Sequence, residues 1–556
     1  MQHAGVLAAV VETGGYINIL KLVPLILLLL VWARLMTWVD KDTVAAQLPR
    51  ELMNTILFFA GLAGFLAFFI LPNTLLAYGV LVFILLASAG TYLVVRHQQV
   101  GLKDLKKELQ GILGAQKKKK KEVKPGEVQI FTKGGNPVPA PDPEDPARAG
   151  YDAAQEFLTV PLRRNAEKIE VRPAAENAVA VRYVVDGVAY NAPAMDKVAA
   201  AEGITFIKKA AGLDISDKRK PQTGMMKVVL AGARHEVEVS TAGSTAGESM
   251  RLVIDPKKRF DHKLDTMGFT AAQLEVIRAY IQQPRGIVLL CAPREQGLTT
   301  MLYTIVRAHD AFVSHIQTIE HSPKEDLEGI TQNRLAPNTT PAEELKQVEW
   351  VTSQQPDIIM MDEIANPASA AELCRFALEG EGRRVYVGMR SPSTFDALTA
   401  WCKLVGDVQT AVAPLVMIVA GRLLRRLCDA CKVAYEPDRE YLRKLNMDPE
   451  RVKTLYQART QPMRDQKGNP IPCNFCQELA FKGRFGVYEV LLVDDEVRQI
   501  ALEGFSVNRL RAALRKQKGH FLQELALARV EAGDTSVQEV VRVLRGDEAK
   551  AARPKQ

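Results

Sequence analysis

The chain has 556 residues, of which 47% are hydrophobic and 24% are charged, and its formal net charge is +8. A chain of this length can hold two or three domains with separate cores, and this composition excludes a wholly disordered protein. The positive charge is modest for the length and its lysines are unevenly placed, so it does not indicate nucleic-acid binding.

Apolar residues dominate the first hundred positions. The stretch 17–39 is long enough to cross a hydrocarbon layer of ~30 Å. A second apolar block, interrupted only at Pro72-Asn73-Thr74, predicts a helical hairpin with spans at 55–71 and 75–95. A cleavable signal peptide fits poorly, because no basic leading segment or small-residue cleavage site frames the first stretch. The alternative is a buried helical domain, but core helices rarely lack a polar face for so long.

Basic residues set the expected orientation. Residues 1–16 contain no Lys or Arg, whereas Arg34, Lys41 and Arg50 accompany the end of the first span and the loop after it. Basic loops stay cytoplasmic, so we expect an external N-terminus, three spans and a large cytoplasmic portion. Residues 96–150 form a basic juxtamembrane segment and a Pro- and Gly-rich linker. A short amphipathic helix is expected at 101–114. The lysine run at 117–121 could attract anionic membrane lipid or merely enforce the topology.

Two folded α/β regions are predicted beyond the linker. A small module over 151–260 combines strand patterns with one helical pattern at 197–211. A larger domain over 261–545 contains continuous apolar runs typical of strands buried on both faces of a parallel sheet. Those runs are 286–291, 316–319, 358–361 and 385–388. Helical stretches separate them, which predicts a doubly wound α/β core.

The strand at 286–291 leads into the place of a phosphate-binding loop. A working GxxxxGK[ST] loop wraps phosphates with backbone N–H groups, sets Lys on the outer phosphates and sets Ser or Thr on magnesium. Gly297 and Thr299 remain here, but Ala292 and Leu298 stand at the first Gly and the Lys positions.

A later strand, 358–361, ends in Asp362 and Glu363. Two carboxylates at such a strand tip can hold Mg²⁺ and orient an attacking water. Glu363 is therefore the candidate general base or water-orienting residue. The alternative is an ordinary charged strand end.

Four cysteines form two CxxC pairs, Cys428 with Cys431 and Cys473 with Cys476. Such knuckles each offer two thiolates to one tetrahedral zinc ion. The long gap between the pairs predicts an insertion. Four thiolates leave no open position, so the zinc would be structural. Buried thiols without a metal are the alternative.

These features resemble the hexameric ATPases of type II secretion and type IV pilus assembly, from about Ile169 to Val541. The stretches that carry the resemblance are VRYVVDGV (181–188), LDISDKRKPQTG (213–224), QPDIIMMDEI (355–364), GRLLRRLCDAC (421–431), CNFC (473–476) and GRFGVYEVLLVDDEVR (483–498). The resemblance implies a RecA-like core with a zinc-binding subdomain over 421–485, preceded by a PAS-like module. It also implies ATP and Mg²⁺ as cofactors and ATP hydrolysis as the activity.

Residue roles follow from the resemblance position by position. Glu363 matches the catalytic glutamate and Glu320 the glutamate of the acidic box. Thr299 matches the magnesium-binding hydroxyl. Arg251 resembles one of the arginines offered to nucleotide. Gly297, Thr300 and Asp362 complete the expected nucleotide site.

The departures from the family pattern converge on that same pocket. Leu298 replaces the lysine, whose loss typically costs ~10²–10³ in rate. Glu238 replaces an arginine, His321 replaces the aspartate of the acidic box, and GMRSPS (388–393) lacks the histidine of the histidine box. The aspartate or arginine expected after Glu363 is also missing. We therefore predict that the scaffold persists while hydrolysis is lost, unless Arg294 substitutes for the missing cation.

The resemblance implies a bacterial inner-membrane location, a homo- or hetero-hexamer and a platform protein in that membrane as partner. Three interpretations remain open at this point. The chain could be a pseudo-ATPase that shapes or regulates the assembly, an active motor with an unusual loop, or a membrane scaffold with no nucleotide role. The tetracysteine motif favours the secretion or assembly branch over retraction motors.

Overall fold

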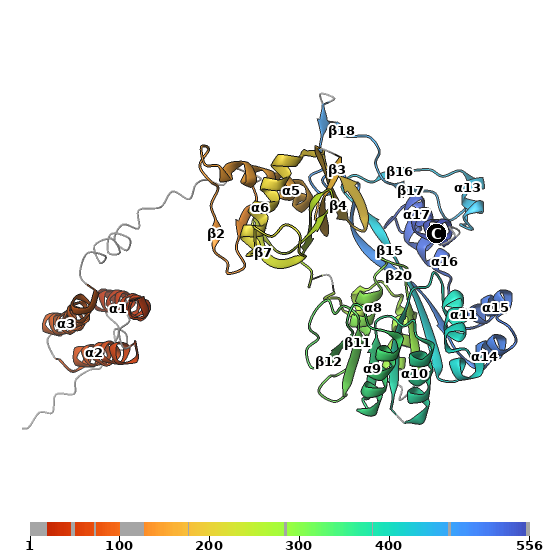
Figure 1. The fold of residues 1–556 in the computed structure, drawn as a ribbon, viewed down its shortest axis with the longest axis horizontal. Helices are drawn as coiled ribbons and strands as arrows, with labels where there is room; N and C mark the ends of the chain where they lie inside the picture. Colours follow the sequence, from red (N-terminus) through yellow and green to blue (C-terminus); the bar gives the residue numbers. More distant parts are fainter. Residues whose placement is uncertain are drawn as a thin grey trace, which may run out of the picture. The chain divides into compact units, whose positions relative to one another are not determined.

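The computed structural model describes residues 19–45, 50–71, 74–100, 127–175, 177–258, 260–282, 286–380, 382–464 and 469–551. They divide into two compact units, Met1–Glu122 and Val123–Gln556 (Figure 1). The predicted break at Pro72-Asn73, the helix at 101–114 and the lysine run at 117–121 lie outside the described residues.

The first unit contains three long helices, α1 (Ile19–Ala45), α2 (Arg50–Ile70) and α3 (Thr74–Val100). Helix α2 packs against both α1 and α3. Trp32, Leu57 and Leu81 are buried between them. A Cβ atom on Gly61 would lie 2.2 Å from Nε1 of Trp32, so the close approach of α1 and α2 requires glycine there.

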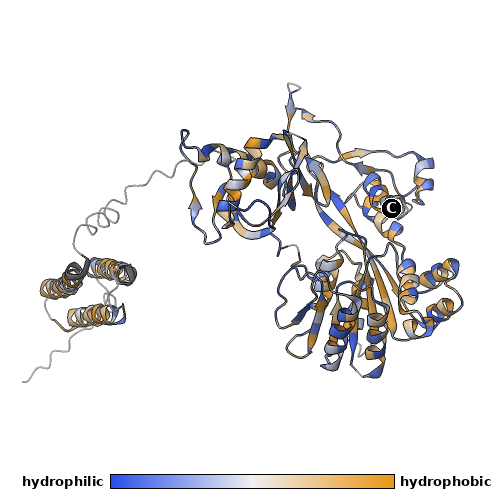
Figure 2. Cartoon of the chain, in the orientation of Figure 1, coloured by the Kyte–Doolittle hydropathy of each residue, from blue (hydrophilic) through white to orange (hydrophobic). Residues whose placement is uncertain are grey.

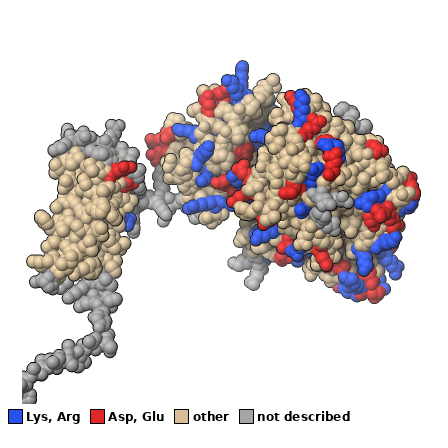
Figure 3. All heavy atoms as spheres, turned by 90° about the horizontal axis from the view of Figure 1, so that it is seen from below, with Lys and Arg blue, Asp and Glu red and all other residues tan. Residues whose placement is uncertain are grey.

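The outward faces of these helices remain apolar. Large side chains such as Phe58 and Phe83 are exposed, and the unit is strongly hydrophobic along its helices (Figure 2). Its described surface carries very few charged side chains (Figure 3). Within the described residues, the stretches Glu51–Ile70 and Leu75–Tyr92 are long and apolar enough to cross a membrane, whereas Val23–Thr37 in α1 is shorter. Membrane association is therefore indicated, by length and composition alone, for α2 and α3.

The second unit begins with an antiparallel sheet covered by two helices. Its strand order is β2-β1-β7-β8-β9-β3-β4-β5, with β6 beside β4. The elements are β1 (Gln129–Phe131), β2 (Pro137–Val138), α5 (Ala147–Arg163), β3 (Lys168–Ala175), β4 (Ala178–Val185), β5 (Val188–Asn191), β6 (Met195–Asp196), α6 (Lys197–Ala211), β7 (Gln222–Leu230), β8 (Ala233–Ser244) and β9 (Gly247–Ile254).

The helix predicted at 197–211 is confirmed as α6. The Asp196 side chain accepts hydrogen bonds from the backbone N–H groups of Val198 and Ala199, which fixes the first turn. Gly212, with φ 73°, ends the helix in the left-handed conformation that glycine adopts without strain.

The stretch expected to be a linker up to residue 150 differs in the structure. Strand β1 pairs with β7, and Val128 and Ile130 are buried in the core of the module. The alternating pattern Val128-Gln129-Ile130 is only three residues long and lies among Pro and Gly residues. It was therefore too short to indicate a strand by itself.

The larger part of the second unit is a seven-stranded sheet of order β12-β11-β13-β14-β10-β15-β20. All of its pairings are parallel except that of β20 with β15. Its elements are η1 (Leu264–Thr266), α7 (Ala271–Ile281), β10 (Gly286–Cys291), α8 (Leu298–Val306), β11 (Ile316–Glu320), β12 (Thr331–Arg334), α9 (Pro341–Ser353), β13 (Ile358–Met361), α10 (Pro367–Glu379), β14 (Arg384–Met389), α11 (Thr394–Val405), α12 (Val408–Val412), β15 (Leu415–Leu427), β20 (Phe481–Leu492), α14 (Asp495–Leu502), α15 (Val507–Lys516), α16 (Leu522–Glu531) and α17 (Val537–Ala551).

Helices cover both faces of this sheet. One apolar core joins the sheet to α7 and α8, and another joins it to α9, α10, α11 and the C-terminal helices. Every residue of β10 and β13 is buried, as their continuous apolar sequences predicted. The predicted α/β core is thus confirmed.

An insertion joins the long antiparallel strands β15 and β20. It contains β16 (Val433–Tyr435), α13 (Arg439–Lys444), β17 (Leu455–Gln457), β18 (Met463–Arg464) and β19 (Pro470–Ile471). Leu427 pairs with Phe481 at the end of the β15–β20 ladder, so both CxxC pairs lie where this ladder ends. This arrangement accounts for the long sequence gap between the two pairs.

Candidate functional site

The loops that follow β10, β11, β13 and β14 meet at the carboxyl edge of the parallel sheet. Ligands of such sheets bind at this edge. Strand β14 lies between β13 and β10, with Met389 beside Cys291 and Val387 beside Met361. The candidate phosphate loop and the Asp362-Glu363 pair are therefore separated only by the end of β14.

The loop after β10 makes a tight turn in which a residue other than glycine adopts a left-handed conformation. Glu295 has φ 63° and Gly297 has φ 85°. A left-handed conformation costs a residue with a side chain roughly 1–2 kcal/mol. The side-chain oxygen of Gln296 accepts a hydrogen bond of 2.8 Å from the backbone N–H of Leu423. This hydrogen bond holds the loop against β15.

The residue at the lysine position points inward. Leu298 is only 2% exposed and belongs to the core beside α8. Thr299 and Thr300 are partly buried in the first turn of α8, whereas Arg294 is exposed. The described side chains of this loop therefore bring no lysine toward the position of a phosphate.

Glu320 is a buried member of a hydrogen-bond network. Its carboxylate accepts hydrogen bonds from the Tyr303 hydroxyl, from Thr318 Oγ1 at 2.6 Å and from Gln332 Nε2 at 3.0 Å. Burial, followed by the hydrogen bond to Glu320, raises the pKa of Tyr303. This network joins α8, β11 and β12, and it uses both carboxylate oxygens of Glu320.

Both carboxylate oxygens of Asp362 also have hydrogen-bond partners within the chain. One of its carboxylate oxygens accepts a hydrogen bond of 2.9 Å from the backbone N–H of His321, and the other lies 2.8 Å from His321 Nδ1. His321 therefore binds the carboxylate that the sequence predicted to help hold magnesium.

Glu363 faces a cation that the sequence interpretation missed. Arg390 Nε donates to a carboxylate oxygen of Glu363 at 3.2 Å, and its Nη1 lies 3.5 Å from the carbonyl oxygen of Pro293. The available signal was the arginine in GMRSPS, where a histidine was expected.

Arg251 lies on β9 of the antiparallel sheet and is exposed. Its neighbours across the strands are Glu170 on β3 and Ser240 on β8. Charge from Arg251 is a minor contribution to the lowered pKa of Glu170; burial opposes that lowering, and the hydrogen bond from Lys168 is the largest favourable cause. The predicted nucleotide role of Arg251 remains a prediction.

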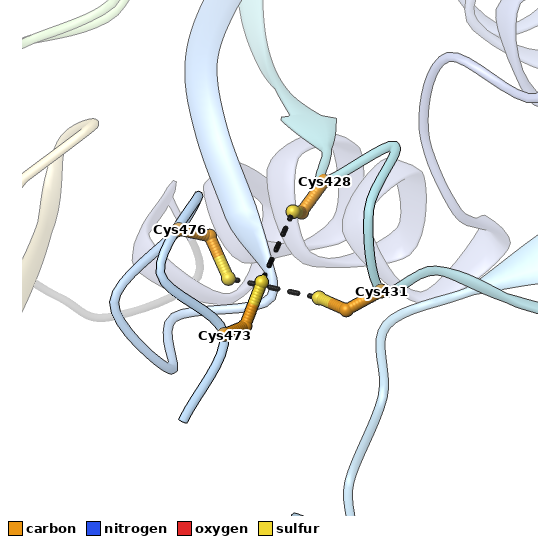
Figure 4. Close-up of side chains that lie close together, drawn as sticks. All are labelled: Cys428, Cys431, Cys473 and Cys476. Carbon is orange, nitrogen blue, oxygen red and sulfur yellow. Dashed lines mark hydrogen bonds between the residues drawn. The ribbon is translucent and has the colours of Figure 1, made fainter. Parts of the chain in front are cut away.

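The four cysteines converge at the end of the β15–β20 ladder (Figure 4). All four are buried, and their Sγ atoms lie within 4.8 Å of one another. Cys428 and Cys473 are separated by 3.9 Å, and Cys431 and Cys476 by 3.6 Å, between Sγ atoms. A tetrahedron with Zn–S bonds of ~2.3 Å has edges of ~3.8 Å, so the arrangement fits a zinc ion. All four thiols are free rather than joined in disulfides.

The thiols differ in their readiness to ionise. Burial raises the pKa of Cys428 and Cys431. Burial acts in the same direction on Cys473, but backbone hydrogen bonds from Cys476 and Phe475 outweigh it and lower its pKa to about 7. Cys473 is therefore converted more readily than Cys428 or Cys431 to the thiolate that a metal binds.

Comparison with known proteins identifies the family. The family model described as Type II/IV secretion system protein matches residues 152–542. The chain belongs to this family. It is 30% identical over 397 residues to the type II secretion system protein HxcR of Pseudomonas aeruginosa, and the alignment covers 70% of the chain and 76% of HxcR.

One further relative and one solved structure extend the comparison. The chain is 29% identical over 405 residues to the type IV pilus assembly ATPase PilB of Thermus thermophilus, covering 71% of the chain and 43% of PilB. The crystal structure of the ATPase DotB of Legionella pneumophila aligns with 73% of the chain and 98% of its own length, at 16% identity and a TM-score of 0.45.

Proposed function

We propose that this chain is a membrane-anchored subunit of a secretion or pilus-like assembly whose nucleotide pocket does not support efficient ATP hydrolysis. Burial of Leu298 carries the proposal, because the fixed cation that stabilises a transferring phosphoryl group is missing from the loop. The carboxylates of Glu320, Asp362 and Glu363, which could serve magnesium or water, all have partners within the chain.

The subunit would form a homo- or hetero-hexameric ring and contact an inner-membrane platform protein. The similarity to a type II secretion system protein and to a type IV pilus assembly ATPase supports this placement. The four cysteines would hold one structural zinc ion, which stabilises the insertion between β15 and β20.

Calorimetry of ATP with Mg²⁺ on the full-length chain tests the pocket. We expect no measurable turnover and binding too weak to detect at micromolar protein. Glu363→Gln is the matched control, since it removes the candidate water-orienting carboxylate and nearly preserves its size. Turnover in the unmodified chain that Glu363→Gln abolishes would establish an active motor and overturn this proposal.

An active motor is the second candidate because Glu363 is still accessible. Its side chain is 45% exposed and lies at the carboxyl edge of the sheet. Thr299 also remains at the start of α8. Tight ATP binding followed by turnover would select this candidate.

The anchor would consist of three spans with the N-terminus outside. The apolar outward faces of α2 and α3 support it, as does the absence of Lys and Arg from residues 1–16. A cysteine at Gly5 should react with a membrane-impermeant maleimide in intact cells, whereas one at Lys133 should react only after lysis. All seven native cysteines are buried, so they give little background. Labelling of both positions only after lysis would contradict the topology.

A further inference from the structure

We propose that Arg390 acts as a latch that ties the phosphate loop to the candidate catalytic glutamate and occupies the carboxylate of that glutamate. The inference rests on the proposed function, and it assigns to Arg390 the role of restraining the candidate nucleotide pocket. Arg390 follows the last residue of β14, the strand between β13 and β10. It therefore projects from the middle of the three loops that would surround a nucleotide.

Two contacts define the latch. The Nε–H group of Arg390 donates to Glu363 at 3.2 Å, and Nη1 lies 3.5 Å from the carbonyl oxygen of Pro293. One guanidinium thus joins the end of β13 to the first part of the loop after β10. The planar fork of arginine can serve two acceptors at once, which a lysine ammonium does less specifically.

The latch opposes catalysis for a chemical reason. A glutamate that orients water must offer its carboxylate to that water. When it is paired with Arg390, Glu363 offers an oxygen to a guanidinium instead, and the positive charge of that group offsets the negative charge of the carboxylate. Hydrolysis therefore meets two separate obstacles. Leu298, at the start of α8, offers no cation to a phosphate, and Glu363, after β13, is restrained by Arg390.

The pair is accessible, with side chains 33% and 45% exposed for Arg390 and Glu363. Such pairs are weak, so the latch adds little to global stability. Its effect should instead appear as local ordering of the loop at 292–297.

Hydrogen exchange of the full-length chain without nucleotide tests the latch directly. Arg390→Gln should speed exchange of amides in 292–297 by about two- to five-fold, the range expected for an exposed ion pair. Glu363→Gln should have a similar effect, and the double variant should exceed neither single one. Arg375→Gln is the matched control, because among the described residues Arg375 pairs only with Glu372 and Glu379 of its own helix.

Unchanged exchange in Arg390→Gln would overturn the latch, and so would additive effects of the two single substitutions. This readout does not depend on whether the unmodified chain binds ATP. Detection of turnover would therefore refute the proposed function while leaving the latch to be judged by exchange.

A gain-of-function comparison adds a second test. In a chain carrying Leu298→Lys, adding Arg390→Gln should raise ATP turnover by about two- to five-fold, the factor by which loss of an exposed ion pair frees Glu363 to orient water. Arg390→Lys should give a smaller increase, since it keeps the charge but loses the fork. A double variant no faster than Leu298→Lys, or slower, would show that Arg390 does not restrain Glu363.

Discussion

At the scale of single residues, the pocket has kept its carboxylates and changed their surroundings. Glu320, Asp362 and Glu363 each accept hydrogen bonds from groups of the same chain. A buried carboxylate without donors would cost several kcal/mol, so the partners of Glu320 in particular preserve the fold. The same partners leave less of each carboxylate for a metal ion or water.

Substitution of one zinc ligand gives a residue-scale prediction. Cys473→Ser should reduce bound zinc from one per chain to well below one and lower the melting temperature, because three thiolates hold the metal less tightly than four. Zinc content by atomic emission and thermal unfolding measure both effects. Cys402→Ala removes a buried cysteine outside the cluster and should keep its zinc. Full zinc content in Cys473→Ser would contradict the assignment.

Sequence patterns predicted which residues are candidates for the site better than they predicted the contacts between those residues. The loop, Glu363 and the four cysteines could be proposed from the sequence because their spacing is local, and the structure brings the four cysteines together. The pairing of Arg390 with Glu363 joins residues 27 positions apart, and that of Arg390 with Pro293 joins residues 97 apart. Only the strand order brings them together, and no local pattern encodes that order.

At the scale of elements, one buried ion pair fastens the last helix to the β15–β20 ladder. Glu539 on α17 accepts hydrogen bonds from Arg425 Nη2 at 2.7 Å and from Arg542 Nε at 2.8 Å. The side chains of Glu539 and Arg425 are 0% and 11% exposed. Burial opposes ionisation of Glu539, but the two arginines outweigh it and lower its pKa.

A pH-dependent loss of stability follows. A carboxyl group whose pKa is lowered by folding stabilises the protein above its unfolded pKa of about 4.3, and this contribution disappears as the pH falls through the lower folded value. Glu539→Gln should reduce the free energy of unfolding by roughly 3 kcal/mol at pH 7, and the difference from the unmodified chain should shrink below pH 4.

Urea unfolding at pH 7 and at pH 3.5 measures this difference. Glu496→Gln serves as the control, because its pair with Lys516 is exposed and should contribute less than 1 kcal/mol. An equal loss at both pH values would show that the charge of Glu539 is not responsible.

Element boundaries were predictable where the pattern was long or continuous. The helix at 197–211 and the strands at 286–291 and 358–361 have the bounds that the sequence predicted. Strand β1 was missed because three residues between Pro- and Gly-rich segments carry too little periodicity. Its place in the sheet depends on β7, about a hundred positions later.

At the scale of the whole molecule, the position of β1 in the sheet determines at which residue a stable fragment of the second unit should begin. A fragment of residues 127–551 should unfold at a higher temperature than one of residues 151–551. The longer fragment retains the buried side chains of Val128 and Ile130, whose burial contributes up to roughly 3–6 kcal/mol. It also retains the hydrogen bonds of Gln155 to both backbone groups of Val128.

Differential scanning calorimetry of the two purified fragments measures this effect. A fragment of residues 127–551 carrying Ile130→Ser is the control, since it keeps the chain length and loses the apolar contact. It should melt between the other two fragments. Equal melting temperatures for all three would place the start of the folded unit after residue 150.

The four-cysteine cluster also bears on how the length of the insertion affects the free energy of folding. Cys428 and Cys473 are 45 positions apart, and a cross-link closing a loop of that size removes roughly 4 kcal/mol of chain entropy from the unfolded state. A metal ion held by the four cysteines would close this loop, and each doubling of the loop's length would then add only about 0.6 kcal/mol. The segment between the two knuckles is therefore the place where evolution can lengthen, shorten or replace sequence while the sheet keeps its geometry.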